Sequence, residues 1–562
     1  MSKSPSEYPW LKHYPKGIPA ELNPDAYPSL LELMEEGFEK FSEQPAYFFM
    51  GKNHTYNQIE KKSRDFAAYL QGLGLKKGDK IAIQMPNCSQ YPVVLYGALR
   101  AGLTVVNTNP LYTPREMKHQ FVDSGAKAIV IVANFAFNLE KVILETEIKH
   151  VIVTELGDML GFPKRPIVNF VVKNVKKMVP PYHLPGRVTF YKALQIGSGQ
   201  TYTRPQLNGD DLAFIQYTGG TTGVSKGAEL NHRNMVANTV GIYHWFSPVM
   251  HFDLPRTILG ALPFYHIFAL TVNAFSTFKL GFHNIMIVNP RDQKAMLKDM
   301  KKHNIFIFPG LNTLFNSLLH NPDFLALDFS NLKITIAGGM ALQKSVAEAW
   351  QQATGCSVTE GYGLSETAPV LSVNPVDGTH QLGTIGVPFP STDMRILKED
   401  GTWGAPGEIG EICAHGPQVM KGYYKRPDET DNVFITDENG RKFFKTGDIG
   451  LMQEDGYFKI VDRKKDMILV SGFNVFPNEV EEVVSQCPGV LEVACIGVPD
   501  EKSTEAVKIF VVKSDASLTE ETVRAFCREN LTAYKCPKFV EFRTELPKTN
   551  VGKILRRELR DN

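Results

Sequence analysis

Residues 217–228 read Tyr-Thr-Gly-Gly-Thr-Thr-Gly-Val-Ser-Lys-Gly-Ala, the most informative motif in the chain. Four Ser/Thr hydroxyls, four glycines and one lysine lie within these twelve residues. Glycine allows backbone N–H groups to converge on one point without a steric penalty. Convergent N–H groups, hydroxyls and an ammonium together suit a polyphosphate. The motif therefore predicts a phosphate-binding loop.

Two further features bear on this phosphate-binding interpretation. The motif is not a Walker loop, which has Gly immediately before Lys, because Ser225 precedes Lys226 here. A plain surface loop between a strand and a helix stays an alternative, since Gly, Ser and Thr are ordinary loop residues. The apolar run Leu212-Ala213-Phe214-Ile215 enters the motif as a strand would, and it favours the phosphate-binding interpretation.

The overall composition is that of a globular protein in a reducing compartment. The 562 residues suffice for about three or four structural units. The formal net charge of +1 gives no field to attract nucleic acid or an acidic partner. Seven scattered cysteines form no Cys-x-x-Cys pair, which argues against zinc and against a disulfide framework. The N-terminus has no apolar core, and no run approaches roughly 18 apolar residues, so we expect a cytoplasmic protein.

Helical and strand-like patterns alternate from residue 56 to about residue 373. A helix followed by a strand is predicted over 56–83, and a helix over 91–101 precedes a strand at 104–106. A further helix from Pro114 precedes the run 128–132, whose wholly apolar character is typical of a buried parallel strand. This alternation predicts an α/β layered fold.

Residues 163–185 interrupt the alternation. Apolar residues recur at helical spacing from Val168 to Val179, while Lys173, Lys176 and Lys177 occupy other faces. An amphipathic helix that docks on the protein itself would show this pattern. A basic helix that rests on an anionic membrane surface would show it too, and both interpretations stay open.

The pattern of predicted helices and strands changes in the C-terminal part of the chain. Short strand-like runs separated by Pro and Gly follow residue 383 and predict a small barrel-like or antiparallel unit to about residue 460. The charge run Asp462-Arg463-Lys464-Lys465-Asp466 then precedes about 100 residues with a compact αβ pattern, so a domain boundary is predicted in the run. That αβ unit is expected to contain a helix near 478–486 and strands at 490–496 and 506–512.

Three more motifs carry chemistry, although each has a plain alternative. Gly361-Tyr362-Gly363-Leu364-Ser365-Glu366-Thr367 joins an aromatic ring, a hydroxyl and a carboxylate, but Ser-Glu also begins helices. Phe443-Phe444-Lys445-Thr446-Gly447-Asp448 is expected to end a strand on an aspartate that would otherwise only shape a turn. Pro547-Lys548-Thr549-Asn550-Val551-Gly552-Lys553 lies near the C-terminus, where Lys553 alone would be a solvated charge.

Taken together, in this order and spacing, these motifs resemble the acyl-adenylate-forming superfamily, and most closely its bacterial long-chain fatty acid–CoA ligases. The resemblance extends from residues 110–115 to the terminal lysine motif. It implies an α/β fold in which a large N-terminal domain of layered α/β subdomains and a small β-barrel-like subdomain precede a mobile αβ C-terminal domain. We expect the domains to span 1–462 and 467–562, with a hinge at 463–466.

The resemblance implies that a fatty acid attacks ATP to give an acyl-adenylate and pyrophosphate, and that CoA then releases AMP and acyl-CoA. Mg²⁺ is the expected cofactor, with ATP and CoA as co-substrates. The residues expected to bind ATP or AMP are Tyr217, Thr218, Gly219, Gly220, Thr221, Thr222, Gly223, Lys226, Gly339, Tyr362, Asp448 and Arg463. The chain departs from the usual family form at Gly219, which is commonly Ser, and at Ser225, which is commonly Pro.

The remaining roles also follow from the resemblance. Lys553, Ser365 and Glu366 are expected to be catalytic, with Glu366 as the magnesium ligand and Lys553 acting in adenylation. His266 is expected to bind or gate the acyl group, although a structural histidine fits its aromatic setting equally well. Lys465 is the expected hinge residue, and Ser471, Gly472 and Phe473 are expected to contact CoA.

Two other functions compete with the CoA ligase. A fatty acid–AMP ligase would pass the adenylate to a carrier protein, but the uninterrupted 462–477 region favours CoA. A non-catalytic acyl or nucleotide sensor would have no use for Lys553. The expected partners are a long-chain fatty acid, ATP and CoA, without nucleic acid, and peripheral contact of 163–185 with the inner face of the cytoplasmic membrane is a hypothesis. The oligomeric state stays open, a dimer included.

Overall fold

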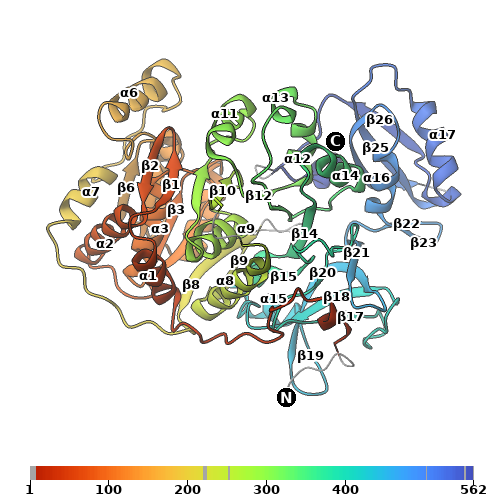
Figure 1. Ribbon diagram of the computed structural model, residues 1–562, viewed down its shortest axis with the longest axis horizontal. Helices are drawn as coiled ribbons and strands as arrows, with labels where there is room; N and C mark the ends of the chain where they lie inside the picture. The colour runs from red at the N-terminus through yellow and green to blue at the C-terminus, as the bar shows by residue number, and fades with distance from the viewer. Residues whose placement is uncertain (1–7, 219–224, 251–253, 501–502, 550–551, 561–562) are drawn as a thin grey trace.

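The structure is a computed structural model that describes residues 8–218, 225–250, 254–500, 503–549 and 552–560. Figure 1 shows an α/β unit on the left and a second in the centre. A smaller β-rich unit lies below the centre, and the C-terminal αβ unit lies on the right. This order confirms the expected α/β fold with a large N-terminal and a small C-terminal part.

The first α/β unit is built on a mostly parallel sheet. The run Ala128–Val132 is fully buried, because helices cover both faces of a parallel sheet. Across the sheet the order is β7 (Val188–Thr189), β6 (His150–Thr154), β5 (Ala128–Val132), β3 (Lys80–Gln84), β4 (Thr104–Asn107), β8 (Leu212–Thr218) and β9 (Lys226–Asn231), with β9 antiparallel to β8. The helices of this unit are α2 (Tyr56–Gly72), α3 (Gln90–Arg100), α4 (Pro114–Ser124), α5 (Ala136–Glu140), α6 (Lys164–Phe170) and α7 (Phe190–Gly197).

Local signals account for the helix ends in this unit. Helix α4 begins after Thr113, whose side chain accepts a hydrogen bond from the Glu116 N–H, and Pro114 suits the first helical position. The helix ends at Gly125, which adopts the left-handed backbone conformation (φ 65°) that favours glycine. The helix and the strand predicted within 56–83 are confirmed as α2 and β3, and the helices predicted over 91–101 and from Pro114 are confirmed as α3 and α4.

The second α/β unit contains the longest sheet and provides most of the walls of the site. Its strand order is β16 (Val387–Pro388), β15 (Val370–Val373), β14 (Val358–Gly363), β13 (Ile334–Ala337), β12 (Ile307–Gly310), β10 (Thr257–Gly260), β11 (His283–Met286), β1 (Pro45–Phe49) and β2 (Lys52–Thr55). The associated helices are α1 (Leu30–Lys40), α8 (His232–Phe246), α9 (Ile267–Ala269), α10 (Thr277–Lys279), α11 (Gln293–His303), α12 (Asn312–Leu319), α13 (Pro322–Leu325) and α14 (Lys344–Thr354).

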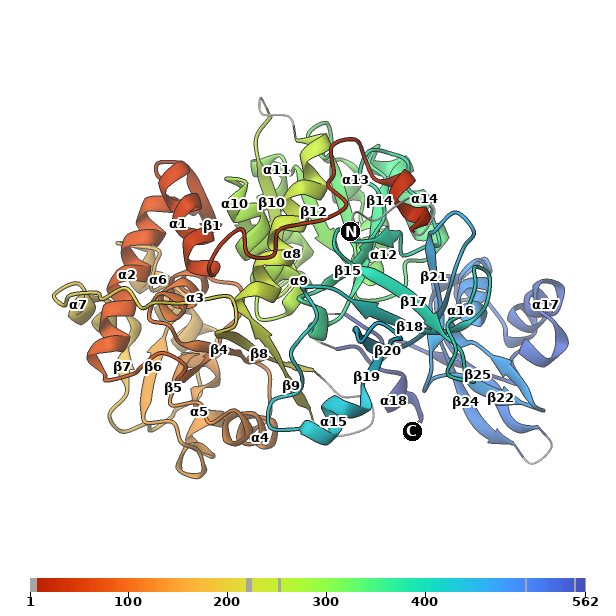
Figure 2. The same cartoon turned by 90° about the horizontal axis from the view of Figure 1, so that it is seen from below.

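The β-rich unit confirms the antiparallel subdomain expected after residue 383. Its strands are β17 (Asp393–Leu397), β18 (Gly410–His415), β19 (Phe434–Thr436), β20 (Lys442–Met452) and β21 (Phe458–Arg463), and helix α15 (Pro427–Asn432) precedes β19. Figure 2 shows that the N-terminal segment crosses the molecule to reach this region. Trp10 of that segment is buried and packs edge-on against Phe458.

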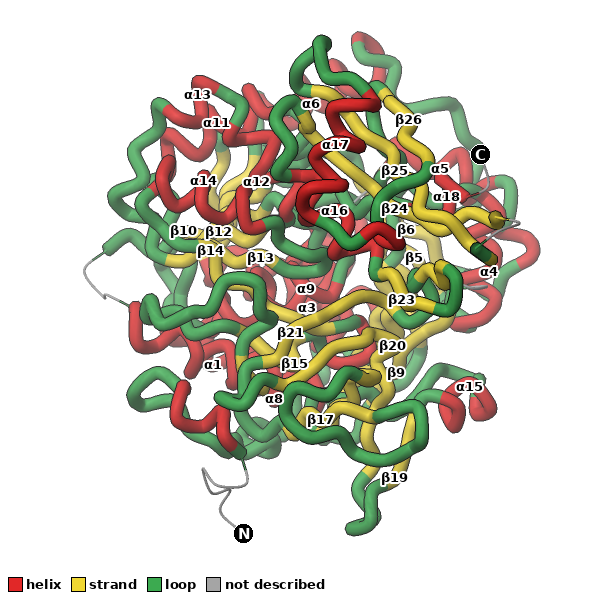
Figure 3. Tube along the Cα trace, turned by 90° about the vertical axis from the view of Figure 1, so that its right-hand side faces the viewer, coloured by secondary structure: helices red, strands yellow, loops and turns green. Residues whose placement is uncertain are grey.

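The C-terminal unit has one sheet with helices on both faces. The strands are β22 (Ile468–Val470), β23 (Phe473–Val475), β24 (Val490–Asp500), β25 (Thr504–Lys513) and β26 (Phe539–Arg543), and the helices are α16 (Pro477–Ser485), α17 (Glu520–Asn530) and α18 (Arg556–Arg560). In Figure 3, α16 and α17 lie side by side over this sheet. The predicted helix near 478–486 and both predicted strands are confirmed.

Three local expectations differ from the structure. Helix α6 and the π-helix at 171–175 end at Val175, and Lys177 has a left-handed backbone (φ 51°), so the predicted pattern to Val179 is only partly helical. Asp448 lies inside β20 rather than at its end, because the strand continues to pair with β21. The glycine-rich motif connects two antiparallel strands, β8 and β9, and not a strand and a helix.

Candidate active site

The glycine-rich motif is anchored at both ends by the β8–β9 pair. Thr218 of β8 pairs with Lys226 of β9, whereas Gly219, Gly220, Thr221, Thr222 and Gly223 lie outside the described residues. The buried Tyr217 side chain points to α4, where its hydroxyl donates to Asp123 Oδ2 at 2.7 Å. The side chain of Tyr217 is thus directed to α4 by this hydrogen bond, and only the backbone of Tyr217 continues into the glycine-rich motif.

Lys226 begins β9 and is held by residues from the β-rich unit. Its ammonium forms an ion pair with Glu429 Oε2 of α15, at a distance of 2.5 Å. It also lies 5.2 Å from the ring centroid of Tyr423, over the face of the ring. A cation over an aromatic face is attracted by the ring electrons.

The Ser365-Glu366 pair forms a single turn of 3₁₀-helix after β14, over Ser365–Thr367. The Glu366 side chain is buried, and its Oε1 accepts a hydrogen bond of 2.8 Å from the Tyr423 hydroxyl. Burial raises the pKa of Glu366, and the hydrogen bond from Tyr423 opposes that shift. Ser365 lines the pocket next to this carboxylate.

Tyr362 and Asp448 are bonded to each other across two units of the molecule. The Tyr362 hydroxyl on β14 donates to Asp448 Oδ2 on β20 at 2.6 Å. Arg463 on β21 approaches the other oxygen, with Nε 3.5 Å from Oδ1. The Tyr362 and Asp448 side chains are buried. Burial raises the pKa of Asp448, and the positive charge of Arg463 lowers it. The tyrosine, the carboxylate and the guanidinium therefore form one polar group.

Lys553 reaches this polar group from the C-terminal unit. Burial and then the positive charge of Arg463 lower the pKa of Lys553 to about 8, although the negative charges of Asp448 and Glu366 oppose the shift. Its loop is fixed by the Thr313 hydroxyl, which donates to the Gly552 carbonyl at 3.1 Å. The structure thus brings Lys553, Asp448 and Glu366 into one electrostatic environment.

The lysine side chain also needs space beside β13. A Cβ atom on Gly339 would lie 3.2 Å from Lys553 Cε, and Gly339 has a positive φ of 81°. His266, at the start of α9, faces the same space. Burial and the charge of Lys553 lower the pKa of His266 to about 3, so this histidine is neutral.

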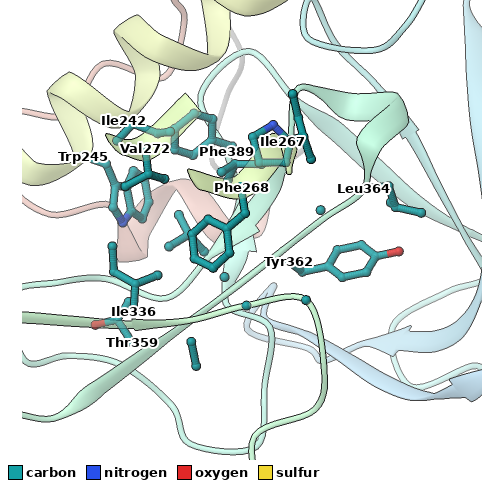
Figure 4. Close-up of a pocket in the computed structure, with 18 of the residues that line it drawn as sticks. Ile242, Trp245, Ile267, Phe268, Val272, Ile336, Thr359, Tyr362, Leu364 and Phe389 are labelled. Atoms are coloured by element: carbon teal, nitrogen blue, oxygen red, sulfur yellow. The ribbon is translucent and has the colours of Figure 1, made fainter. Parts of the chain in front are cut away.

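An apolar pocket extends from this polar end into the second α/β unit. Figure 4 shows Trp245, Val272, Ile336 and Phe268 gathered in the apolar part, with Tyr362 beyond them. Phe268 lines the pocket, whereas Leu270 is buried in the adjoining core. The polar end is lined by His266, Gly339, Tyr362, Ser365 and Lys553. An extended apolar molecule with one polar end matches this division.

The residues expected at the hinge and the CoA site lie elsewhere. Lys465 is largely exposed in the turn between β21 and β22, but partial desolvation of its ammonium by neighbouring residues lowers its pKa to about 8. Ser471 and Gly472 form the turn of the β22–β23 hairpin, and both have a positive φ. Phe473 is 57% exposed and stacks on Tyr534. This hairpin does not contribute to the pocket lining.

Sequence reasoning missed several residues of the site. Tyr423 and Glu429 contact Glu366 and Lys226, but nothing in the local sequence distinguishes them from ordinary surface residues. Arg556 was also missed: its guanidinium contacts Asp462 and Asp466, the first and last residues of the charge run, and Glu481 on α16. The two aspartates of that run, four residues apart, and the Arg556-Arg557 pair near the C-terminus were the only sequence features that could have suggested this ion-pair group.

Comparisons with solved structures agree with the observed arrangement. The anthranilate CoA ligase AuaEII in complex with anthranoyl-AMP has a TM-score of 0.83, at 22% identity over 96% of this chain and 98% of that chain, and shows the fold alone. ATP-bound MatB from Rhodopseudomonas palustris has a TM-score of 0.81, at 28% identity over 94% of this chain and 98% of that chain. The apo form of MatB has a TM-score of 0.71, so the arrangement here is closer to the ATP-bound form.

Sequence comparisons identify the family. Residues 34–424 match the model for AMP-binding enzymes, and residues 479–553 match the model for the C-terminal domain of AMP-binding enzymes. The long-chain-fatty-acid–CoA ligase of Escherichia coli O157:H7 is 55% identical over 553 residues, or 98% of each chain. That of Haemophilus influenzae Rd is 51% identical over 555 residues, or 98% of each chain. The chain therefore belongs to the AMP-binding enzyme family, together with these long-chain-fatty-acid–CoA ligases.

Proposed function

We propose that the protein activates long-chain fatty acids with ATP and transfers the acyl group to CoA. The observation that carries this proposal is the apolar pocket that ends at Lys553, where an ammonium lies near two buried carboxylates. Relatives of 51–55% identity over nearly the whole chain bear the same activity in their names. The reaction proceeds through an acyl-adenylate and releases AMP and pyrophosphate.

In the first step, a carboxylate oxygen of the fatty acid attacks the α-phosphorus of ATP. The bond from that phosphorus to the bridging oxygen breaks, and pyrophosphate leaves. Negative charge accumulates around phosphorus during this exchange, so a fixed cation beside it lowers the barrier. Lys553 is the cation that lies at the polar end of the pocket. We assign it to this step, with Ser365 as a donor to the α-phosphate.

The nucleotide would lie between β14, β20 and the glycine-rich motif. Tyr362 and Gly339 would contact adenine, and their place at the polar end of the pocket supports this assignment. Asp448 would accept the ribose hydroxyls, with one oxygen already fixed by Tyr362 and with Arg463 beside it. Thr218 and Lys226, at the two ends of the motif, would hold the β- and γ-phosphates together with residues 219–223.

We assign Mg²⁺ to Glu366. Magnesium is held in many phosphate-transfer sites by one or two carboxylates together with the substrate phosphates. Glu366 fits this requirement because it is a buried carboxylate whose Oε1 is already oriented by Tyr423. When bound, Mg²⁺ would neutralise phosphate charge, and the protein supplies the fixed oxygen ligand.

The second step requires the C-terminal unit to move. We divide the chain into domains 1–462 and 467–562 with a hinge at 463–466, and Lys465 lies in this connection between two sheets. The hairpin with Ser471, Gly472 and Phe473 is remote from the pocket lining in the present arrangement. Rotation about the hinge would present this hairpin to CoA, whose sulfur attacks the acyl carbon as the bond to AMP breaks.

The length of the acyl group is set by the apolar part of the pocket. Ile242 and Trp245 of α8 and Val272 of the π-helix at 270–276 line it, and none offers a charge. His266 is neutral and lies towards the polar end, where it is placed to contact the acyl carboxyl group. A short acid such as acetate would leave most of the apolar surface without contact.

AMP release measured over a series of acids from acetate to stearate, with and without CoA, tests the proposal. We expect palmitate and stearate to give higher kcat/KM values than acetate, and sustained AMP release to require CoA. A preference for acetate would contradict the long-chain assignment. Sustained AMP release or adenylate transfer to a carrier protein without any effect of CoA would instead favour the fatty acid–AMP ligase.

We further propose that the region around α6 contacts the cytoplasmic face of a membrane. None of the described helices is long and apolar enough to cross a bilayer, so contact would be peripheral. Apolar side chains around α6 are exposed to solvent, and they are Phe162 (93%), Ile167 (56%), Phe170 (59%), Val175 (64%) and Met178 (53%). Exposed apolar groups that lie beside lysines are typical of segments that bind anionic membrane surfaces.

Vesicle binding tests the contact. Replacement of Lys173, Lys176 and Lys177 by Ala should weaken binding to vesicles that contain anionic lipid by roughly 100-fold, because each lysine contributes on the order of 1 kcal/mol. Unchanged binding would contradict the proposal.

A matched triple variant at Lys294, Lys298 and Lys301 removes three exposed lysines from α11 and should leave vesicle binding unchanged. An equal loss in both variants would show only a general charge effect, and would also contradict it.

A further inference from the structure

The chain segment after β18 is fixed along the outer edge of β9 by backbone hydrogen bonds. The Lys421 N–H donates to the Glu229 carbonyl at 3.2 Å, and the Glu229 N–H donates to the Gly422 carbonyl at 2.9 Å. The Tyr424 N–H donates to the Gly227 carbonyl at 2.8 Å. This segment thus forms a short antiparallel bridge to β9, with Tyr423 opposite Ala228, and backbone geometry determines where its side chains lie.

Helix α15 is tied to the same segment. The Tyr423 N–H donates to Thr430 Oγ1 at 2.9 Å, and Arg426 forms an ion pair with Asp123 of α4 at 2.7 Å. The Met420 N–H also donates to the backbone carbonyl of Glu366 at 2.7 Å. Residues 420–432 therefore form one segment that contacts both β9, the strand after the glycine-rich motif, and the 3₁₀ turn that contains Glu366.

The side chain of Tyr423 contacts the two charged residues assigned above to magnesium and phosphate. Its hydroxyl donates to Glu366 Oε1 at 2.8 Å, and its ring face lies 5.2 Å from the Lys226 ammonium. Glu429 completes the set, because its Oε2 lies 2.5 Å from the same ammonium. The Tyr423 side chain thus connects Glu366, which follows β14, with Lys226, which begins β9.

We propose that Tyr423 is a positioning residue for adenylation, and that Glu429 is a counter-ion of Lys226 that the ATP phosphates displace. This proposal rests on the proposed function, because it takes Glu366 as the magnesium ligand and Lys226 as a phosphate ligand. The Tyr423 hydroxyl fixes the orientation of Glu366, and its ring keeps the lysine beside the phosphates. Hydrogen-bonding partners of metal ligands commonly contribute 10- to 100-fold to metal affinity.

Glu429 has a different and smaller effect. The Lys226–Glu429 pair is partly exposed, with side-chain exposures of 26% and 45%, so solvent screens it. Glu429 holds the Lys226 ammonium when no nucleotide is bound. Replacement of this carboxylate by an ATP phosphate as the partner of Lys226 costs little free energy. Removal of the Glu429 charge should therefore strengthen ATP binding, by about fivefold at most, and high salt should reduce the difference.

The test measures nucleotide binding to the full-length protein by calorimetry, without fatty acid or CoA. Tyr423→Phe keeps the ring and removes the hydroxyl, so we expect ATP binding in the presence of Mg²⁺ to weaken by about 10-fold or more. AMP binding without Mg²⁺ should stay unchanged. Tyr424→Phe is the matched control, because Tyr424 packs against Ile215 and Tyr217 rather than against Glu366.

Three outcomes would overturn the proposal. Equal Mg²⁺-dependent ATP binding by Tyr423→Phe and the unaltered protein would remove the positioning role. Equal weakening of AMP binding without Mg²⁺ would show a structural effect instead. Unchanged ATP binding by Glu429→Gln at low salt would remove the counter-ion role. Failure of the proposed function is a separate result, because the unaltered protein would then bind no ATP with Mg²⁺.

Discussion

The charge of Lys553 predicts how adenylation depends on pH. An ammonium beside the α-phosphate must be protonated to offset the charge that develops there. Burial and the neighbouring Arg463 lower the pKa of Lys553 from 10.5 to about 8, although Asp448 and Glu366 oppose the shift. Because the protonated form is the active one, adenylation is retained below pH 8 and lost as the pH rises above it.

The size of the effect follows from this pKa. With a pKa of about 8, Lys553 is about 90% charged at pH 7 and about 10% charged at pH 9. The kcat/KM for ATP should therefore fall by about tenfold between these two pH values, because kcat/KM reports groups of the enzyme before ATP binds. An arginine stays charged over this range, so Lys553→Arg should be less active at pH 7 but independent of pH up to 9.

The assay is pyrophosphate exchange without CoA, at saturating fatty acid and varied ATP, from pH 6.5 to 9.5. Omission of CoA removes the ionisation of its thiol from the profile. Lys465 also has a pKa of about 8, and the arginine variant separates the two lysines. A fall in kcat/KM that persists in Lys553→Arg would assign the effect to another group. A flat profile in the unaltered protein would refute the reasoning.

Other predictions concern single side chains. Lys553→Ala should lower adenylation by at least about 100-fold, while thioester formation from supplied acyl-adenylate changes little; equal losses in the two half-reactions would contradict the two arrangements of the C-terminal domain. Glu366→Ala should reduce turnover by about 10²–10³-fold and raise the Mg²⁺ concentration needed for half-maximal rate; near-normal values would remove it from the site. Arg556→Met removes the guanidinium that pairs with the fully buried Asp462, so it should lower the free energy of unfolding by about 3 kcal/mol, measured by urea denaturation. A change below about 1 kcal/mol would contradict this. Val272→Phe fills part of the apolar pocket and should lower kcat/KM for palmitate more than for octanoate; equal reductions would place Val272 outside the acyl path.

The elements of the fold were largely predictable because their signals are local. The run 128–132 is apolar at every position, as a strand buried on both faces requires, and it forms β5. Pro114 and Gly125 mark the two ends of α4, and their backbone preferences act within one turn. The helical prediction for 163–185 was only partly correct: residues 164–175 are helical, but the apolar spacing continues to Val179, beyond Lys177, which adopts a left-handed conformation.

The site was predictable only as a set of residue types. Each motif contains groups that suit its assigned chemistry, but their partners lie far away in the chain. Asp448 was expected at the end of a strand, and pairing with β21 instead extends the strand through it. Tyr423 could not be identified, because its position depends on backbone bonds to β9, and β9 lies almost two hundred residues earlier.

The sequence by itself determined which helices and strands form and which residues can carry phosphate, metal and acyl chemistry, because helix caps, periodicity and side-chain type are properties of neighbouring residues. Tertiary structure alone decided that Lys553 shares its environment with Asp448 and Glu366, and that Lys226 pairs with Glu429. Those contacts join all four units of the structure, and they exist only when whole units pack against one another, which no local pattern specifies.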